Sequence, residues 1–328
     1  MTTRQPLVFF GSGAFGVPTL EAICREHDVR AVVTQPDRPA GRGGSMTPTP
    51  VAQWIAAHRP DIPVVKPERV NDPEVVGSIR AHGAGIFVVI AFGQKMGRTL
   101  LEGIDAMNLH ASLLPRWRGA APINAAILAG DTVTGNSVIT LADRMDAGRV
   151  LGQSERQIEP AQTAGELHDL LATDGPALVL RVIDEVSRGA CPGREQDESK
   201  VTKASKLSRD DGWVDFGTSA ELCRRRVHGL TPWPGVSVGI VGEQSVEKRS
   251  LKLLRVQAVE RRSEEDPGTL VDAAAGTVAC AGGSGLRLLE VQAPGKKPMN
   301  WAEFQRGRQL AAGTKFLGRE HQGSDLKC

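Results

Sequence analysis

The sequence predicts an α/β domain with a doubly wound, mostly parallel sheet, followed by a small OB-like β-barrel domain. The chain opens with an apolar run at 7–10, a glycine turn at 11–16 and a helical pattern at 17–23, which is the strand–turn–helix unit of such sheets. Residues 86–91 form a continuous apolar run, as expected for a strand buried on both faces. Beyond residue 207, short strands separated by turns replace the long helices.

The remaining elements follow from hydrophobic periodicity. In the first domain we expect strands at 29–34, 64–65, 104–109, 137–141 and 150–151, and helices at 51–57, 72–81, 122–128 and 164–186, the last as one helix or two. In the second we expect a helix at 219–227 and strands at 236–241, 251–259, 269–271, 277–280 and 286–291. A length of 328 residues suits two domains, which we place at 1–188 and 207–328, joined by a linker at 189–206.

Three glycines near the start, Gly11, Gly13 and Gly16, match a dinucleotide-binding fingerprint. That function needs an acidic residue at the tip of the second strand to bind the ribose hydroxyls. Here the tip is Thr34, and Asp37 follows only within a Pro/Gly loop. The pattern therefore favours a tight turn that packs a helix on a strand, for which glycine is equally suited.

Composition restricts the remaining possibilities. The net charge is +2, so the whole-chain balance does not indicate nucleic acid, although residues 207–328 carry 18 basic against 15 acidic residues. The five cysteines are scattered and have no CxxC spacing, which favours free thiols in a reducing compartment. The chain has no signal-peptide pattern and no apolar stretch of roughly twenty residues. We therefore expect a cytoplasmic protein with no membrane association.

The most informative stretch is NLHASLLPRWRGAAPI, which covers residues 108–123. Asn108 and His110 are two positions apart at the end of an apolar run, so their side chains project to the same side of an extended backbone. An amide donor and an imidazole can together hold a carbonyl oxygen and move a proton. Asp146, beside a glycine turn, is either a plain turn residue or a carboxylate that returns to the His110 side.

The segment 35–50, QPDRPAGRGGSMTPTP, is a long loop rich in Pro, Gly and Arg. Structureless loops of this length usually act as lids or binding loops. Arg38 and Arg42 are placed to reach a phosphate, and the alternative is a solvated loop. Arg224, Arg225 and Arg226 could likewise form a nucleic-acid surface on the barrel or a solvated helix face.

From position 8 to about 310 the chain resembles the methionyl-tRNA formyltransferase family, which has a Rossmann-like formyltransferase domain. The resemblance rests on the following motifs: FGSGAFGVPTL, QPDRPAGRG, AFGQKM, NLHASLLPRWRGAAPI, TGNSVITLADRMDAGRVL, HGLTPWPG and VQAPGKKPM. It implies transfer of the formyl group of 10-formyltetrahydrofolate to the α-amino group of methionyl-initiator tRNA. Formylation of an amino sugar nucleotide, hydrolysis of formyl-folate, and a non-catalytic binding protein are the alternatives.

The resemblance also assigns residues. Catalysis is implied for Asn108, His110 and Asp146. Folate is placed along Ala91, Phe92, Gly93, Gln94, Lys95, Ser112, Leu113, Leu114, Pro115, Thr140, Leu141 and Asp143. Contacts to tRNA are expected from Arg38, Arg42, Lys203, Lys206, Arg224, Arg225, Arg226, Lys296 and Lys297. The folate is a co-substrate, no metal and no NAD are expected, and the protein is expected to act as a monomer.

The sequence departs from the family pattern at three places. Trp117 stands where tyrosine or phenylalanine is usual, and Phe92 where tyrosine is common, in keeping with a chain that has no tyrosine. A tyrosine hydroxyl at these positions is therefore not required. Gly44 and Ser45 stand where lysines are common, which lowers the expected positive charge of the 35–50 loop.

Overall fold

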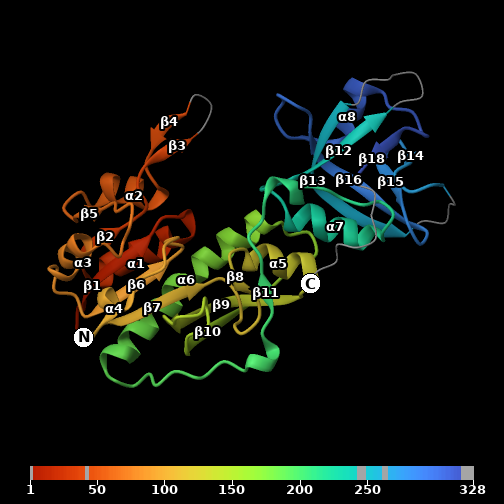
Figure 1. Cartoon of the computed structure of the whole chain (residues 1–328). Helices are drawn as coiled ribbons and strands as arrows, with labels where there is room; N and C mark the ends of the chain where they lie inside the picture. Colours follow the sequence, from red (N-terminus) through yellow and green to blue (C-terminus); the bar gives the residue numbers. More distant parts are fainter. Residues whose placement is uncertain (1–2, 41–43, 242–248, 261–264, 319–328) are drawn as a thin grey trace. The chain divides into compact units, whose positions relative to one another are not determined.

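The computed structural model describes residues 3–40, 44–241, 249–260 and 265–318 (Figure 1). The chain forms two compact units. The first comprises Met1–Gly119, Val133–Gln157 and His168–Lys203, and the second Ala120–Thr132, Ile158–Leu167 and Ala204–Cys328. Two segments that precede residue 200 in the chain are therefore part of the second unit.

The first unit is built on a sheet in the order β10-β9-β7-β6-β1-β2-β5. Its strands are β1 (Pro6–Gly11), β2 (Asp28–Val33), β5 (Val64–Val65), β6 (Ile86–Ile90), β7 (Asp105–His110), β9 (Val133–Thr140) and β10 (Val150–Gln157). Strands β5, β2, β1, β6 and β7 pair in parallel, whereas β9 pairs antiparallel with both β7 and β10. The predicted doubly wound, mostly parallel sheet is confirmed.

Apolar side chains cover the sheet of the first unit. The helices of this part of the chain are α1 (Val17–Glu26), α2 (Pro50–His58), α3 (Pro73–Arg80), α4 (Arg98–Leu101) and α6 (Ala164–Ser187). On one face of the sheet, alternate residues such as Phe10 and Phe87 pack with Ile79 of α3 and Leu100 of α4. On the other face, Leu109 of β7 packs against Gly175 of α6. A Cβ added at Gly175 would lie 2.8 Å from Cδ2 of Leu109.

The glycine turn after β1 is a close-packing feature. An added Cβ on Gly11 would lie 2.5 Å from the Phe9 ring, and one on Gly16 would lie 3.2 Å from the same ring. Ile90 of the neighbouring strand contacts both positions. Helix and strand approach closely enough here to account for both glycines.

Parts of the 35–50 segment form strands that the sequence does not predict. Strands β3 (Arg38–Ala40) and β4 (Ser45–Thr47) pair as an antiparallel ribbon that projects from the first unit (Figure 1). Thr49 then caps α2 by accepting a hydrogen bond from the Ala52 amide. The open choice for 164–186 is also resolved, since α6 is one helix with Pro176 inside it.

The second unit is an antiparallel barrel-like sheet in the order β14-β15-β16-β13-β12-β18. Its elements are α5 (Pro122–Ala129), α7 (Ala220–Gly229), β12 (Val236–Val241), β13 (Arg249–Glu260), β14 (Leu270–Asp272), β15 (Thr277–Cys280), β16 (Ser284–Gln292), β17 (Met299–Asn300), α8 (Trp301–Arg308) and β18 (Lys315–Leu317). A bridge from Thr269 to Lys315 joins the two edges, so the barrel is nearly closed, as predicted. Helix α8 and strands β17 and β18 were not predicted.

Candidate functional site

Asn108 and His110 lie in the last half of β7, at the carboxyl end of a strand in an open parallel sheet, where ligands bind in such folds. Leu109 between them points to the α6 face. The alternation of a strand therefore places Asn108 and His110 together on the opposite face. This confirms the same-side geometry that their two-residue spacing predicts.

The His110 ring is 7% exposed and has a different neighbour at each nitrogen. Its Nε2 lies 2.9 Å from the carbonyl oxygen of Trp117. A carbonyl only accepts, so we assign the ring proton to Nε2. The other nitrogen, Nδ1, lies 3.7 Å from Oδ1 of Asp146. The unprotonated nitrogen of a neutral His110 therefore faces a carboxylate.

Asp146 is held in place from its backbone and its side chain. Its φ is 53°, a left-handed conformation that non-glycine residues rarely adopt. Its Oδ2 accepts a hydrogen bond of 2.8 Å from the Gly119 amide. Its side chain is only 14% exposed, whereas Met145 beside it is 72% exposed. The loop thus turns Asp146 inward, and the choice left open by the sequence is settled in favour of a carboxylate that returns to His110.

The segments 91–95 and 140–143, which carry many of the predicted folate residues, are linked by hydrogen bonds. Lys95 donates from Nζ to the carbonyl of Asp143 at 3.0 Å, and Arg98 forms an ion pair of 2.8 Å with the Asp143 carboxylate. The Arg98 guanidinium lowers the pKa of Asp143. The Phe92 carbonyl accepts from the side chains of Ser12 and Gln35. Both segments therefore have a defined position in the first unit.

The leucine corner at 112–115 is fixed by two serines. Ser112 donates from Oγ to the Arg116 carbonyl at 2.7 Å. Ser137 of β9 donates to the Ser112 carbonyl and accepts from the Leu114 amide. Gln153 of β10 adds a bond to the Leu114 carbonyl. These hydrogen bonds fix the corner, which comes directly after the end of β7 that carries Asn108 and His110.

Sequence reasoning missed several groups that position the site. The Trp117 carbonyl and the Gly119 amide belong to the motif that carries His110, but their backbone roles have no side-chain signal. Arg118 is 8% exposed and contacts Gln196 and Glu198 of the predicted linker. A buried arginine in such a motif is a signal that could have pointed to an acidic partner nearby.

The residues predicted to bind tRNA differ in their surroundings. Lys203, Lys206, Lys296 and Lys297 are exposed. Arg38 forms an ion pair of 2.6 Å with Glu68, and Arg42 lies outside the described residues.

The three arginines of α7 are engaged within the second unit. Arg224 and Arg225 both bind the Glu221 carboxylate, at 2.7 and 2.8 Å, and Arg224 lowers the pKa of Glu221 to about 2. Arg226 lies 3.6 Å from the centre of the Trp213 ring and donates to the Trp213 carbonyl. Whether these arginines form a nucleic-acid surface or a solvated helix face stays a prediction, and Glu221 offsets part of their charge in either case.

No helix in the described part of the chain has the length and apolarity to cross a bilayer. Within the same residues, no three or more His, Cys, Asp or Glu side chains gather in a group that could hold a metal ion.

The α/β fold places an amide and an imidazole at the carboxyl end of β7 and a carboxylate beside the imidazole, a set of groups typical of enzymes that act on a carbonyl group. Two family models match the chain: "Formyl transferase" at residues 6–183 and "Formyl transferase, C-terminal domain" at 206–309. The chain belongs to the formyl transferase family and is a formyl-transferring enzyme.

Curated relatives match over nearly the whole chain. A methionyl-tRNA formyltransferase of Acidobacterium capsulatum is 40% identical over 316 residues, which cover 94% of this chain and 99% of the relative. A protein of the same name from a Methylobacterium species is 40% identical over 313 residues, covering 94% and 98%.

Solved structures share the fold. HypX from Aquifex aeolicus, solved in complex with tetrahydrofolic acid, has a TM-score of 0.61 at 15% identity; the match covers 92% of this chain but only 47% of HypX, so the chain spans about half the length of HypX. An N-formyltransferase from Helicobacter canadensis, solved with folinic acid and dTDP-3-aminofucose, has a TM-score of 0.61 at 14% identity, covering 87% and 99%.

Proposed function

We propose that the protein transfers the formyl group of 10-formyltetrahydrofolate to the α-amino group of methionyl-initiator tRNA. The observation that carries the proposal is the His110–Asp146 pair beside Asn108, in a chain about 40% identical over 94% of its length to methionyl-tRNA formyltransferases. Formyl transfer between two nitrogens needs an oxyanion donor and a carrier for one proton. These three residues have the required chemistry.

The amine attacks the formyl carbon, and the carbonyl oxygen becomes an oxyanion. The Asn108 amide is the proposed donor to that oxygen, and one preorganised donor typically contributes about 3–4 kcal/mol of transition-state stabilisation. The C–N bond to N10 of the folate then breaks, and N10 takes up a proton. The net result is a formamide on methionine and tetrahydrofolate.

His110 carries the proton in this scheme. Its Nδ1 faces Asp146 Oδ1, so it can take the proton that the attacking amine loses. The resulting imidazolium has a partner at each nitrogen, the Trp117 carbonyl at Nε2 and the Asp146 carboxylate at Nδ1. Asp146 thereby stabilises the charged ring until the proton is delivered to N10.

Folate is proposed to lie along 91–95, 112–115 and 140–143, as the family resemblance implies. The support is that the second of these segments follows β7 directly, and that Lys95 ties the first to the third. The formyl group on N10 of the folate would then meet the strand end that carries Asn108 and His110. The formyl carbon is the part of the folate that these two side chains must reach.

Binding of tRNA is proposed to rely mainly on charge. The exposed lysines at 203, 206, 296 and 297 are the contacts that we favour, together with Arg42. Because Arg224 and Arg225 already share Glu221, we expect a smaller contribution from α7. We further propose that the domains span 1–188 and 207–328, and that the protein acts as a monomer in the cytoplasm.

The test is to incubate the protein with labelled 10-formyltetrahydrofolate and charged initiator tRNA, and to follow label on the methionine. We expect labelling that disappears with uncharged tRNA. A free amino sugar nucleotide should remain unlabelled under the same conditions. Label on the sugar and none on methionine, or release of formate without transfer, would contradict the proposed acceptor.

A further inference from the structure

The loop that carries Asp146 lies between β9 and β10 and has little support of its own. Met145 is exposed, and the φ of 53° at Asp146 costs of order 1–3 kcal/mol unless the surroundings hold it. An added Cβ at Gly148 would lie 1.7 Å from the Thr140 carbonyl oxygen, so the end of the loop is pressed against β9. Something outside the loop must fix the position of the Asp146 carboxylate relative to His110.

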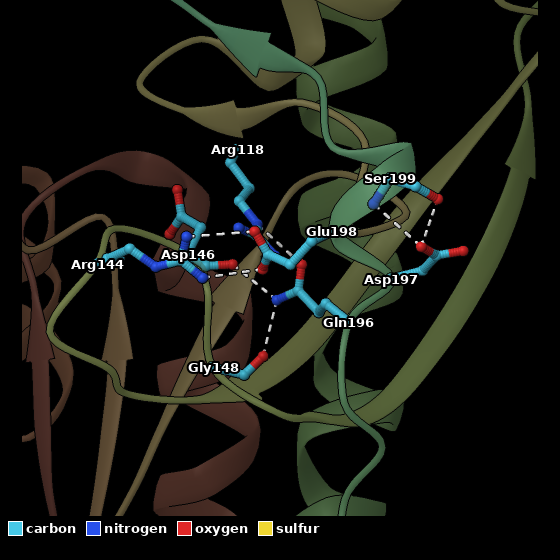
Figure 2. A network of polar contacts seen from close by, with 8 residues as sticks. All are labelled: Arg118, Arg144, Asp146, Gly148, Gln196, Asp197, Glu198 and Ser199. Carbon is cyan, nitrogen blue, oxygen red and sulfur yellow. Dashed lines mark hydrogen bonds and ion pairs between the residues drawn. The ribbon is translucent and has the colours of Figure 1, made fainter.

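Gln196 provides that support from the segment predicted to be a linker. Its Nε2 donates to the carbonyl oxygens of Asp146 and Gly148, each at 2.7 Å (Figure 2). Its Oε1 accepts from Nε of Arg118 at 3.0 Å. Since carbonyls only accept and the guanidinium only donates, these contacts fix the orientation of the Gln196 amide.

Arg118 is in turn fixed on several sides. Its terminal nitrogen binds Glu198 at 2.9 Å, and Glu198 also binds Arg144 of the Asp146 loop at 3.0 Å (Figure 2). The backbone amide of Arg118 donates to the Thr202 carbonyl at 2.9 Å. Hydrogen bonds from the two arginines lower the pKa of Glu198.

The network converges on the two proposed catalytic side chains. Arg118 lies between Trp117, whose carbonyl accepts from His110, and Gly119, whose amide binds Asp146. Through its side chain, the same residue holds Gln196, which binds the Asp146 backbone. The segment 117–119 thus positions both His110 and Asp146. Its backbone binds the His110 ring and the Asp146 carboxylate, and the Arg118 side chain holds Gln196, which binds the Asp146 backbone.

We propose that Gln196, held by Arg118, is a positioning residue that fixes the Asp146 carboxylate opposite Nδ1 of His110. The inference rests on the proposed function, because it assumes that Asp146 acts in formyl transfer. It assigns a role in the reaction to a residue between the two matched family regions, the first of which ends at residue 183 and the second of which begins at residue 206.

The most informative variant is Gln196→Glu. It keeps the length of the side chain and an acceptor for Arg118, but it removes the amide donor that binds the carbonyl oxygens of Asp146 and Gly148. We expect kcat to fall by about 10–100-fold, the range typical of losing a supporting contact behind a reactive group. The KM values for both substrates should stay within about twofold, because Gln196 contacts neither in this scheme. Gln196→Ala, which removes both contacts without adding charge, should give the same pattern.

Three further measurements make the test decisive. Glu195→Ala changes the exposed neighbour, which forms an ion pair with Arg149, and should leave kcat unchanged. Asp146→Asn should lower kcat by about 100-fold or more. In the Asp146→Asn background Gln196→Glu should add less than about a twofold loss, because two residues that act as one unit are not additive.

Full kcat in both Gln196 variants would overturn the inference while leaving the proposed function intact. So would a loss from Gln196→Glu that is equally large with Asp146 present and in the Asp146→Asn background. Full kcat in Asp146→Asn would instead remove the catalytic assignment of Asp146, and the inference with it. Thermal melting and retained folate binding show that each variant is folded.

Discussion

Two buried histidines in this chain have opposite environments. His110, in the first unit, has a carbonyl at Nε2 and a carboxylate 3.7 Å from Nδ1. His228, at the end of α7 in the second unit, is 0% exposed and accepts a hydrogen bond at Nε2 from the Val256 amide. Burial, together with the charge of Arg224, lowers the pKa of His228 to about 4.

The comparison shows that burial does not make a histidine reactive. His228 faces two positive side chains, Arg224 and Arg255, and the opposing charge of Glu166 does not compensate for them and for burial. Its imidazolium form is therefore disfavoured, and the neutral ring serves packing and one backbone bond. His110 has an acceptor at each nitrogen once it is protonated, so its charged form has partners in place.

The largest effect that distinguishes the two residues is on turnover. His110→Ala should lower kcat by about 100–10,000-fold, because it removes the proton carrier. His228→Gln, which keeps an acceptor for Val256, should leave kcat within about twofold. Steady-state formylation of charged tRNA measures both. A comparable loss of kcat in the two variants would mean that the difference in environment has no catalytic meaning.

The next effect is on the pH dependence of stability. The folded-state pKa of His228 lies at about 4, below its ordinary value of 6.5, so the unfolded state binds more protons between these values. The contribution of the neutral ring is complete above about pH 6.5 and is lost as pH falls towards 4, by up to about 3 kcal/mol. Burial lowers the pKa of His27 as well, which acts in the same direction.

Urea unfolding at about pH 7 and about pH 5 measures this contribution. The drop in stability between the two pH values should be clearly smaller in His228→Gln than in the unchanged protein. Equal drops in His228→Gln and the unchanged protein would show that His228 does not titrate in this way.

The smallest effect concerns Glu221, which offsets the charge of Arg224 beside His228. Its pKa is lowered to about 2 by Arg224, then by Arg225, so its stabilisation is present above about pH 4.5 and is lost as pH falls towards 2. Because the Glu221 side chain is 42% exposed, Glu221→Gln should cost only about 1 kcal/mol at neutral pH. Glu21→Gln, in the exposed pair with Arg25, is the control and should change the melting temperature little.

Local patterns predicted much of the fold because each pattern reflects burial that the final structure keeps. The apolar run at β6 is buried along its whole length, and the helix pattern from position 164 is a single helix. The paired β3 and β4 were missed, because Pro and Gly signals indicate a loop and say nothing of pairing between the segments around it. Helix α8 was missed too, although Asn300 and Glu303 form a capping box at its start.

By itself the sequence determined the residue types of the site and the same-side geometry of Asn108 and His110, because residues two apart on a strand share a face. Only the tertiary structure decided which carboxylate faces His110 and which residues hold it. Asp146 is 36 positions away, and Gln196 a further 50. Such contacts depend on how distant segments pack, and hydrophobic periodicity carries no information on that. The same reason separates Arg118 from a solvated arginine, since its partners Gln196 and Glu198 lie 78 and 80 positions further along the chain.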